Sequence, residues 1–183
     1  MELRPYQHSA VEAVYRHLRE HDGNPVVVIP TGGGKTPVMA TICRDAVRHW
    51  NGRVLILAHV KELLQQSVDK LKLVCPELPV GVFSAGLNRR DTQQSVIVAG
   101  IQSVYQRAAD LGAFDLVLID ECHLLPADGE GMYRQFLADA TALNPALRVV
   151  GFTATPFRLD AGPNCRDDHF LNTICYDVGI REL

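Results

Sequence analysis

The sequence predicts an α/β domain in which a mostly parallel central sheet is covered by helices on both faces. Three observations support this fold class. Short runs of apolar, often β-branched residues alternate along the chain with longer amphipathic segments, as in sheets whose strands are buried on both faces. A glycine-rich turn joins one of these runs directly to a helix. Polar motifs follow several of the strands, and that is where ligands bind in such sheets.

The elements follow in chain order. A first helix begins at Pro5, which suits a first helical turn, and its apolar face carries Val11, Val14 and Leu18. Helical periodicity predicts further helices from the glycine turn to about residue 50, over 59–73, from about 102, and over 131–143. Apolar runs predict strands at 26–29, 53–58, 80–83, 95–99, 114–119 and 147–152, with a polar loop at 84–92.

The glycine-rich turn follows the first strand and consists of Thr31, Gly32, Gly33, Gly34, Lys35 and Thr36. Its glycines leave backbone N–H groups uncovered, and the helix N-terminus adds partial positive charge, so the turn can hold an anion. Lys35 can reach the β- and γ-phosphates of a nucleotide, and the Thr36 hydroxyl can ligate Mg²⁺. Ile29 stands where the strict phosphate-loop pattern has glycine, so a tight turn without a ligand is the alternative.

Composition limits the class of protein. A chain of 183 residues with 47% hydrophobic and 21% charged residues can bury a real core as one large or two small domains. The net charge of −3 gives no global basic signature for nucleic acid. The five cysteines are scattered without CxxC pairs, which favours free thiols in a reducing compartment. No apolar run reaches the length of a membrane span, so we expect a cytoplasmic protein.

A second strong motif, Asp120-Glu121, ends the strand at 114–119. A carboxylate pair at the end of a buried strand is costly unless it has a function. Beside a phosphate loop, Asp120 would hold Mg²⁺ directly or through water, and Glu121 would orient and deprotonate the attacking water. A solvated strand end is the alternative. Zinc binding by Cys122 and His123 is a weaker one, because no second ligand pair lies nearby.

Taken together, six motifs resemble those of the first RecA-like domain of superfamily 2 helicases. They cover nearly the whole chain in the family's order: 4–7, 30–36, 57–63, 100–103, 120–123 and 153–156. Within the superfamily, the chain is most similar to the DEAD/DEAH-type group that contains bacterial RadD (YejH) proteins and the helicase subunits of type III restriction enzymes. That group often has alanine in the acidic box where this chain has Cys122, a small neutral residue that keeps the chemistry.

The resemblance implies roles at the nucleotide. Gln7 matches the glutamine that recognises the adenine edge, with Arg4 and Tyr6 packing near the base; a solvated first-turn residue is the alternative for Gln7. Lys35, Asp120 and Glu121 match the catalytic positions. His123, Thr153 and Thr155 match the residues that couple the nucleotide state to nucleic-acid binding. The alternative for the two threonines is that their hydroxyls cap the local backbone.

The resemblance also implies a nucleic-acid track. His59, Lys61, Gln102 and Ser103 match positions on it, and hydroxyl, amide and backbone groups suit phosphates recognised without base specificity. A solvated helix start is an equal alternative for Lys61. Arg89 and Arg90 could extend the track, although a charged loop is the simpler interpretation. Arg158 follows the threonine motif and its role is open.

Superfamily 2 motors have a second RecA-like domain that supplies arginine fingers, and we find no second phosphate site in this sequence. We therefore expect residues 1–160 to form the first RecA-like domain and residues 161–183, which show no clear periodicity, to form an exit loop and the start of an interdomain connection. The second domain would be supplied in cis or in trans. Without arginine fingers, which contribute roughly 10³–10⁵ in rate, the isolated domain should bind nucleotide weakly and hydrolyse little.

The sequence thus predicts the N-terminal ATP-binding motor domain of an ATP-dependent DNA helicase or translocase, acting in DNA repair or restriction, with ATP and Mg²⁺ as cofactors and nucleic acid, DNA favoured, as partner. One alternative is a catalytically vestigial, nucleotide-dependent nucleic-acid-binding module. Another is a small-molecule phosphate-loop kinase, which gives no reason for Gln7 or for Thr153 and Thr155.

Overall fold

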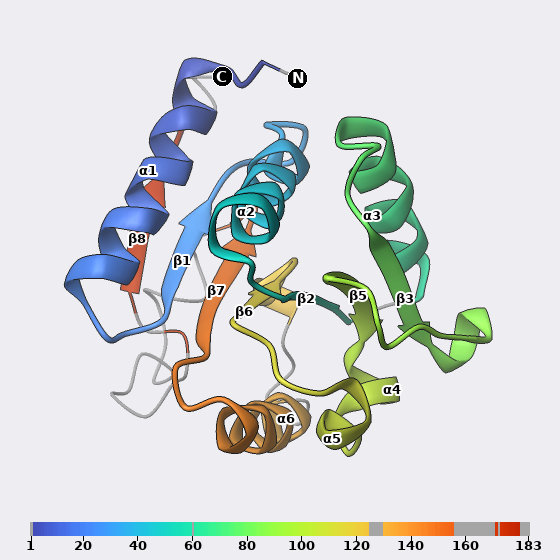
Figure 1. The fold of residues 1–183 in the computed structure, drawn as a ribbon. Coiled ribbons are helices and arrows are strands. Elements are labelled where there is room, and N and C mark those ends of the chain that lie inside the picture. The colour runs from blue at the N-terminus through green and yellow to red at the C-terminus, as the bar shows by residue number, and fades with distance from the viewer. Residues whose placement is uncertain (1, 60, 125–129, 156–170, 172, 180–183) are drawn as a thin grey trace.

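The computed structural model describes residues 2–59, 61–124, 130–155, 171 and 173–179 (Figure 1). Helices alternate with strands along most of this length. The helices are α1 (Pro5–Glu20), α2 (Lys35–Trp50), α3 (Lys61–Val74), α4 (Ile101–Val104), α5 (Ala108–Leu111) and α6 (Glu130–Leu143). The strands are β1 (Pro25–Val28), β2 (Val54–Ala58), β3 (Val80–Ser84), β4 (Arg89–Arg90), β5 (Val96–Gly100), β6 (Leu116–Ile119), β7 (Arg148–Thr153) and β8 (Thr173–Asp177).

Within the described residues, eight strands form one sheet in the order β4-β3-β5-β2-β6-β7-β1-β8. Every pairing is parallel except that of the two-residue β4 with β3. The chain order differs from the spatial order, so β1 and β2 are separated by β6 and β7. The predicted mostly parallel α/β fold is confirmed.

Helices cover both faces of the sheet, and each face has its own apolar core. The helices α1, α2 and α3 pack on one face and α4, α5 and α6 on the other (Figure 1). Side chains alternate between the two faces along each strand. In β6, for example, Leu116 and Leu118 enter the core beneath α1–α3, whereas Val117 and Ile119 enter the core above α4–α6. This alternation explains why the strands are apolar throughout.

Two segments differ from the sequence-based expectation. Residues 84–92, expected as a polar loop, contain a 3₁₀ turn, η1 (Ala85–Leu87), and the short antiparallel strand β4. The expectation of an irregular segment after residue 160 is wrong for Thr173–Asp177, which form β8 beside β1. This edge strand is half-exposed and its register shifts between Val26 and Val27, so it lacks the regular pattern that identifies a buried strand.

None of the helices in the described ranges is both long enough and apolar enough to span a membrane.

Candidate nucleotide site

The glycine-rich turn connects β1 to α2 at the carboxyl edge of the sheet. Gly32 and Gly34 adopt left-handed backbone conformations, with φ of 81° and 83°, which residues other than glycine rarely adopt. A Cβ added to Gly34 would lie 2.2 Å from Nε2 of Gln7. The left-handed backbone conformation therefore favours glycine at both positions, and a side chain at Gly34 would also displace the Gln7 amide.

Tyr6 and Gln7, at the start of α1, hold this turn. The Tyr6 hydroxyl donates a hydrogen bond to the Gly33 carbonyl at 2.7 Å, and the Gln7 amide nitrogen lies 3.4 Å from the Gly33 and Gly34 carbonyls. Gln7 is 5% exposed, and its amide oxygen accepts from the Arg4 backbone N–H at 2.9 Å. The alternative of a solvated first-turn residue is therefore wrong for Gln7, which braces the phosphate loop.

A cavity of about 520 Å³ opens between α1 and α2, next to Gln7 along α1. Its volume lies in the range of sites for small molecules. Its lining mixes charged, polar and apolar side chains: Glu2, Leu3, His8, Val11, Thr41, Arg44 and Asp45.

Lys35 is the first residue of α2, and its ammonium group forms an ion pair with Oε1 of Glu121. The side chains are 11% and 23% exposed, respectively, so the pair is only weakly screened by solvent. Thr36 follows in the first turn of α2 and is half-buried. Glu121 has φ of 50°, a left-handed conformation that is strained for a side chain of its size. In this conformation the Glu121 carboxylate reaches Lys35 at the end of the glycine-rich turn.

Asp120 follows β6 directly, and its backbone N–H donates to the Leu57 carbonyl of β2 at 3.0 Å. Its Oδ1 accepts from the Glu121 backbone N–H at 2.9 Å, and its Oδ2 accepts from the Ser67 hydroxyl of α3 at 3.3 Å. Burial raises the pKa of the Asp120 carboxyl above its ordinary value, and the charge of Lys35 opposes this shift. A cation beside this carboxylate would relieve the cost of keeping it ionised in the interior.

The residues present fit a magnesium ion that is shared with a nucleotide. No group of three or more His, Cys, Asp or Glu suited to a metal occurs in the described ranges. Mg²⁺ does not need one, because it keeps several waters and takes one or two protein oxygens together with substrate phosphates. The carboxylate of Asp120 and the hydroxyl of Thr36 supply oxygens of that kind.

His123 lies in the 3₁₀ turn η2 (Cys122–Leu124) and connects Glu121 to β7. Its Nδ1 lies 3.3 Å from Oε2 of Glu121 and 2.9 Å from Oγ1 of Thr153. The Thr153 hydroxyl donates to the Thr155 carbonyl at 3.1 Å, so we assign the imidazole hydrogen to Nδ1, which donates it to Thr153. Oε2 of Glu121 has no hydrogen-bond partner among the described residues. Thr153 is fully buried. A continuous chain of contacts therefore runs from Lys35 through Glu121 and His123 to the threonine motif.

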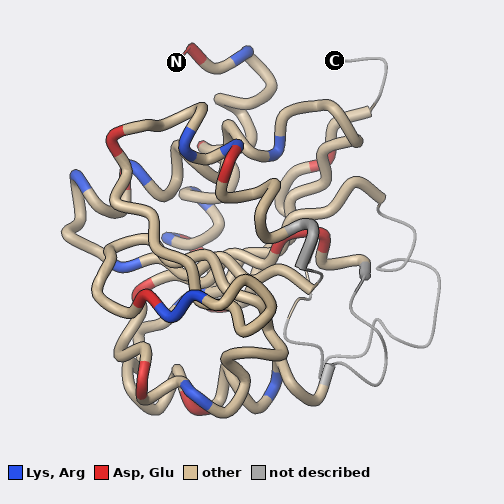
Figure 2. The backbone as a smooth tube through the Cα atoms, turned by 90° about the vertical axis from the view of Figure 1, so that its right-hand side faces the viewer, with Lys and Arg blue, Asp and Glu red and all other residues tan. Residues whose placement is uncertain are grey.

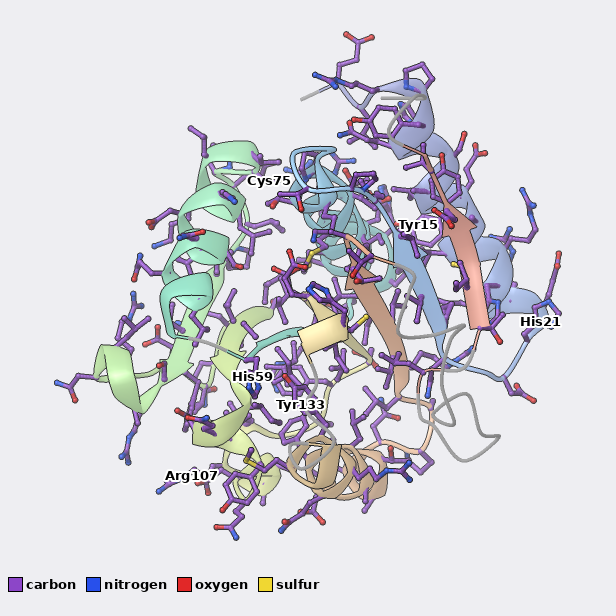
Figure 3. All side chains as sticks on the ribbon, turned by 180° about the vertical axis from the view of Figure 1, so that it is seen from behind. Tyr15, His21, His59, Cys75, Arg107 and Tyr133 are labelled. Atoms are coloured by element: carbon purple, nitrogen blue, oxygen red, sulfur yellow. The ribbon has the colours of Figure 1, made fainter. Side chains whose placement is uncertain are left out.

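The residues expected on a nucleic-acid track lie at the ends of β2 and β5. His59 is half-buried after β2 (Figure 3), and its buried Nδ1 has no hydrogen-bond partner in the described part of the chain. Gln102 is exposed, and Ser103 accepts a hydrogen bond from the Ala85 backbone N–H at 3.0 Å. The side chain of Lys61, and Arg158 entirely, lie outside what the structure describes. The contact chain from Lys35 through Glu121 and His123 to Thr153 includes none of these track residues.

Basic and acidic residues are interspersed over the described part of the chain. Figure 2 shows Lys and Arg spread among Asp and Glu rather than gathered on one face, in keeping with the net charge of −3. Arg89 is engaged locally by an ion pair with Asp91. Its side chain thus favours the simpler interpretation of a charged loop over an extension of the track.

Cys122 is unsuited to zinc. Its side chain is buried, and this burial raises the pKa of its thiol to about 12. No group of three or more His, Cys, Asp or Glu that could hold a metal occurs around it in the described ranges. Cys122 instead packs in the core above α4–α6, with its sulfur 3.1 Å from the position a Cβ on Gly151 would take.

Sequence patterns missed Ser67, which donates a hydrogen bond to Asp120. The available signal was a serine on the apolar face of α3, where it lies three residues after Leu64 and four before Leu71. Periodicity identifies such a position as facing inward but does not name the partner.

Comparisons with known proteins show the family and the fold of the chain. Residues 1–158 match the family described as "Type III restriction enzyme, res subunit". The chain is 32% identical over 184 residues to the DNA 3'-5' translocase XPB2 of Sulfurisphaera tokodaii, a match that covers 100% of this chain and 37% of the relative. Across two of the curated relatives that it matches, the chain spans 27% and 37% of their length.

Solved structures show the same fold. The UvsW helicase of bacteriophage T4 superposes with a TM-score of 0.72 at 18% identity, covering 96% of this chain and 60% of that one. The Sulfolobus solfataricus SWI2/SNF2 ATPase core, solved with double-stranded DNA, gives 0.69 at 16% identity, covering 87% and 33%. The chain thus belongs to the family of type III restriction-enzyme res subunits and has the fold of the first RecA-like domain of superfamily 2 helicases.

Proposed function

We propose that this chain is the N-terminal ATP-binding motor domain of an ATP-dependent DNA helicase or translocase. The observation that carries the proposal is the contact chain from Lys35 through Glu121 and His123 to Thr153. It joins a phosphate-binding lysine to a carboxylate and then to a threonine motif on a separate strand. A simple nucleotide-binding module, or a kinase acting on a small molecule, gives no reason for this last link.

In this proposal, the uncovered N–H groups of the glycine turn and Lys35 hold the phosphates of ATP. Gln7, Tyr6 and Arg4 shape the loop and meet the base. Glu121 orients the attacking water and accepts its proton. Thr36 and Asp120 would hold Mg²⁺, which neutralises charge that develops on the phosphate oxygens. His123, Thr153 and Thr155 relay the state of the nucleotide site to the nucleic acid.

DNA is the partner that the relatives favour, since the translocase from Sulfurisphaera tokodaii is named for DNA. We place it along the same carboxyl edge, over His59, Lys61, Gln102 and Ser103. We further propose a second RecA-like domain, in cis or in trans, that closes over the nucleotide. The chain spans only 27% and 37% of two curated relatives, which leaves room in them for such a domain. A RadD-like role in repair, or a role in restriction, remains part of the proposal.

We also propose a cytoplasmic location. The described cysteines carry free thiols, which suit a reducing compartment.

The direct test of the nucleotide site is the affinity of the chain for Mg·ATP, measured by titration calorimetry. Replacing Lys35 with Ala should weaken binding by about tenfold or more, because a charge-assisted contact to phosphate is lost. Lys70→Ala, an exposed lysine on α3, is the matched control and should bind as the parent does. Equal affinities for the parent and Lys35→Ala would contradict the proposal.

A further inference from the structure

Ser67 is the residue outside the recognised motifs that contacts the candidate metal-binding carboxylate. It lies in the second turn of α3, and its hydroxyl is 3.3 Å from Oδ2 of Asp120. The contact follows from topology. β2 and β6 are neighbours in the sheet, and Asp120 continues the alternation of Leu116 and Leu118 onto the face that α2 and α3 cover. The Asp120 carboxylate is thus placed between the phosphate loop at the start of α2 and the second turn of α3.

The two oxygens of Asp120 are held from two different directions. Oδ1 accepts from the Glu121 backbone N–H at 2.9 Å, and Oδ2 accepts from Ser67. One donor alone would leave the carboxylate free to rotate about its Cβ–Cγ bond, whereas two donors on opposite oxygens define its plane. Each carboxylate oxygen keeps a further lone pair for a metal or a metal-bound water.

A serine in a helix has another option, which is to donate to a carbonyl four residues earlier in its own helix. Ser9 of α1 does so, with its hydroxyl 3.2 Å from the Pro5 carbonyl. The Ser67 hydroxyl instead donates from α3 to Asp120 at the end of β6. Its neighbours Leu64, Val68 and Leu71 are 1–2% exposed core residues, so the hydroxyl stands at the polar border of an apolar stripe.

We propose that Ser67 is a positioning residue that orients the Asp120 carboxylate for the Mg²⁺ of a bound Mg·nucleotide, an inference that rests on the proposed function. Partners that hydrogen-bond a metal-binding group typically contribute about 10–100-fold to metal affinity. Because the Ser67 contact is long, the lower end of that range applies. The bond also connects the candidate metal-binding carboxylate to α3, the helix that begins at Lys61, itself a predicted track residue.

The test compares the affinity for ATP in the presence of Mg²⁺ with that in the presence of EDTA, by titration calorimetry on the 183-residue chain. Ser67→Ala should weaken binding about tenfold with Mg²⁺ and less than about twofold without it. Ser67→Thr keeps the hydroxyl and should retain most of the affinity. Gln65→Ala is the control, because it removes a different hydrogen bond on the same helix, the 2.8 Å contact to Asp69.

Two results would overturn the role of Ser67. One is parental Mg·ATP affinity in Ser67→Ala. The other is an equal loss with and without Mg²⁺, which would indicate a general disturbance of α3. These results are distinguishable from failure of the proposed function. If the parent chain itself does not bind Mg·ATP, both the proposed function and the role of Ser67 are overturned.

Discussion

Glu121 occupies a left-handed backbone conformation that costs about 1–2 kcal/mol for a residue with a Cβ. The same residue pairs with Lys35 through one carboxylate oxygen, and its other oxygen lies 3.3 Å from Nδ1 of His123. Strain at one residue is thereby offset by a local network. This is the pattern expected where a side chain must be aimed at a ligand rather than packed for stability.

Gly34 offers a sharp test of the loop geometry at the residue scale. Gly34→Ala should destabilise the chain by about 1–3 kcal/mol, because φ is 83° and the new Cβ would lie 2.2 Å from Nε2 of Gln7. Urea denaturation followed by circular dichroism measures the change. Gly131→Ala in α6 is the control, since a Cβ there meets nothing within 4 Å. Equal stability of the two variants would show that the loop geometry is wrong.

At the scale of elements, the two edges of the sheet differ in the contacts that their residues make. At the amino edge, two arginines tie loops to strands. Arg53 donates to the Leu111 and Thr92 carbonyls, both at 2.9 Å, and Arg148 donates to the Leu18 carbonyl at 2.8 Å. Candidate site residues gather at the opposite, carboxyl edge. Segments at the amino edge are thus fixed by protein contacts, and the residues that we propose to bind the nucleotide lie at the opposite edge.

The C-terminal end of α1 predicts a pH dependence of stability. Burial lowers the pKa of His17 below its ordinary value of 6.5, and the charge of Arg148 adds to the shift, while the bond from the ring to the Gly23 carbonyl opposes it. The neutral ring is therefore favoured in the folded state. Its contribution to the free energy of unfolding is fully present above pH 6.5 and is lost as the pH falls through the lowered pKa.

Urea denaturation at a series of pH values between 7.5 and the acid limit measures this effect. The parent should lose stability more steeply below about pH 6.5 than His17→Gln, whose amide can still donate to Gly23. His49→Gln, at an exposed position on α2, should follow the parent. Parallel pH profiles for the parent and His17→Gln would rule out this contribution.

At the scale of the whole molecule, the fold and the clustering of the main motifs were predictable from the sequence for one physical reason. A parallel sheet brings the residues after each strand to a single edge, so Lys35, Asp120 and Thr153 could be expected to meet there. Strand identity followed from apolar runs buried on both faces. Those signals are local in the chain and do not depend on distances between helices.

The features that escaped prediction depend on such distances. The Ser67–Asp120 bond requires the packing of α3 against the end of β6, and the Lys35–Glu121 pair requires the backbone conformation of Glu121. The strand β8 is half-exposed at the sheet edge, so its sequence lacks the continuous apolar run that identifies a buried strand. Gln7 was predicted as an adenine contact from family resemblance, and its bracing of the loop emerged only from the burial of its side chain.

The central claim is that this domain drives ATP hydrolysis coupled to DNA. The most direct measurement is phosphate release, with and without DNA, by an assembly of this domain with its second RecA-like domain. Glu121→Gln should still bind ATP. It should release phosphate at least about 100-fold more slowly than the parent, because the general base is lost. Glu12→Gln, exposed on α1, is the control. DNA should stimulate the parent and the control; an unstimulated parent, or a Glu121→Gln variant that turns over normally, would contradict the account.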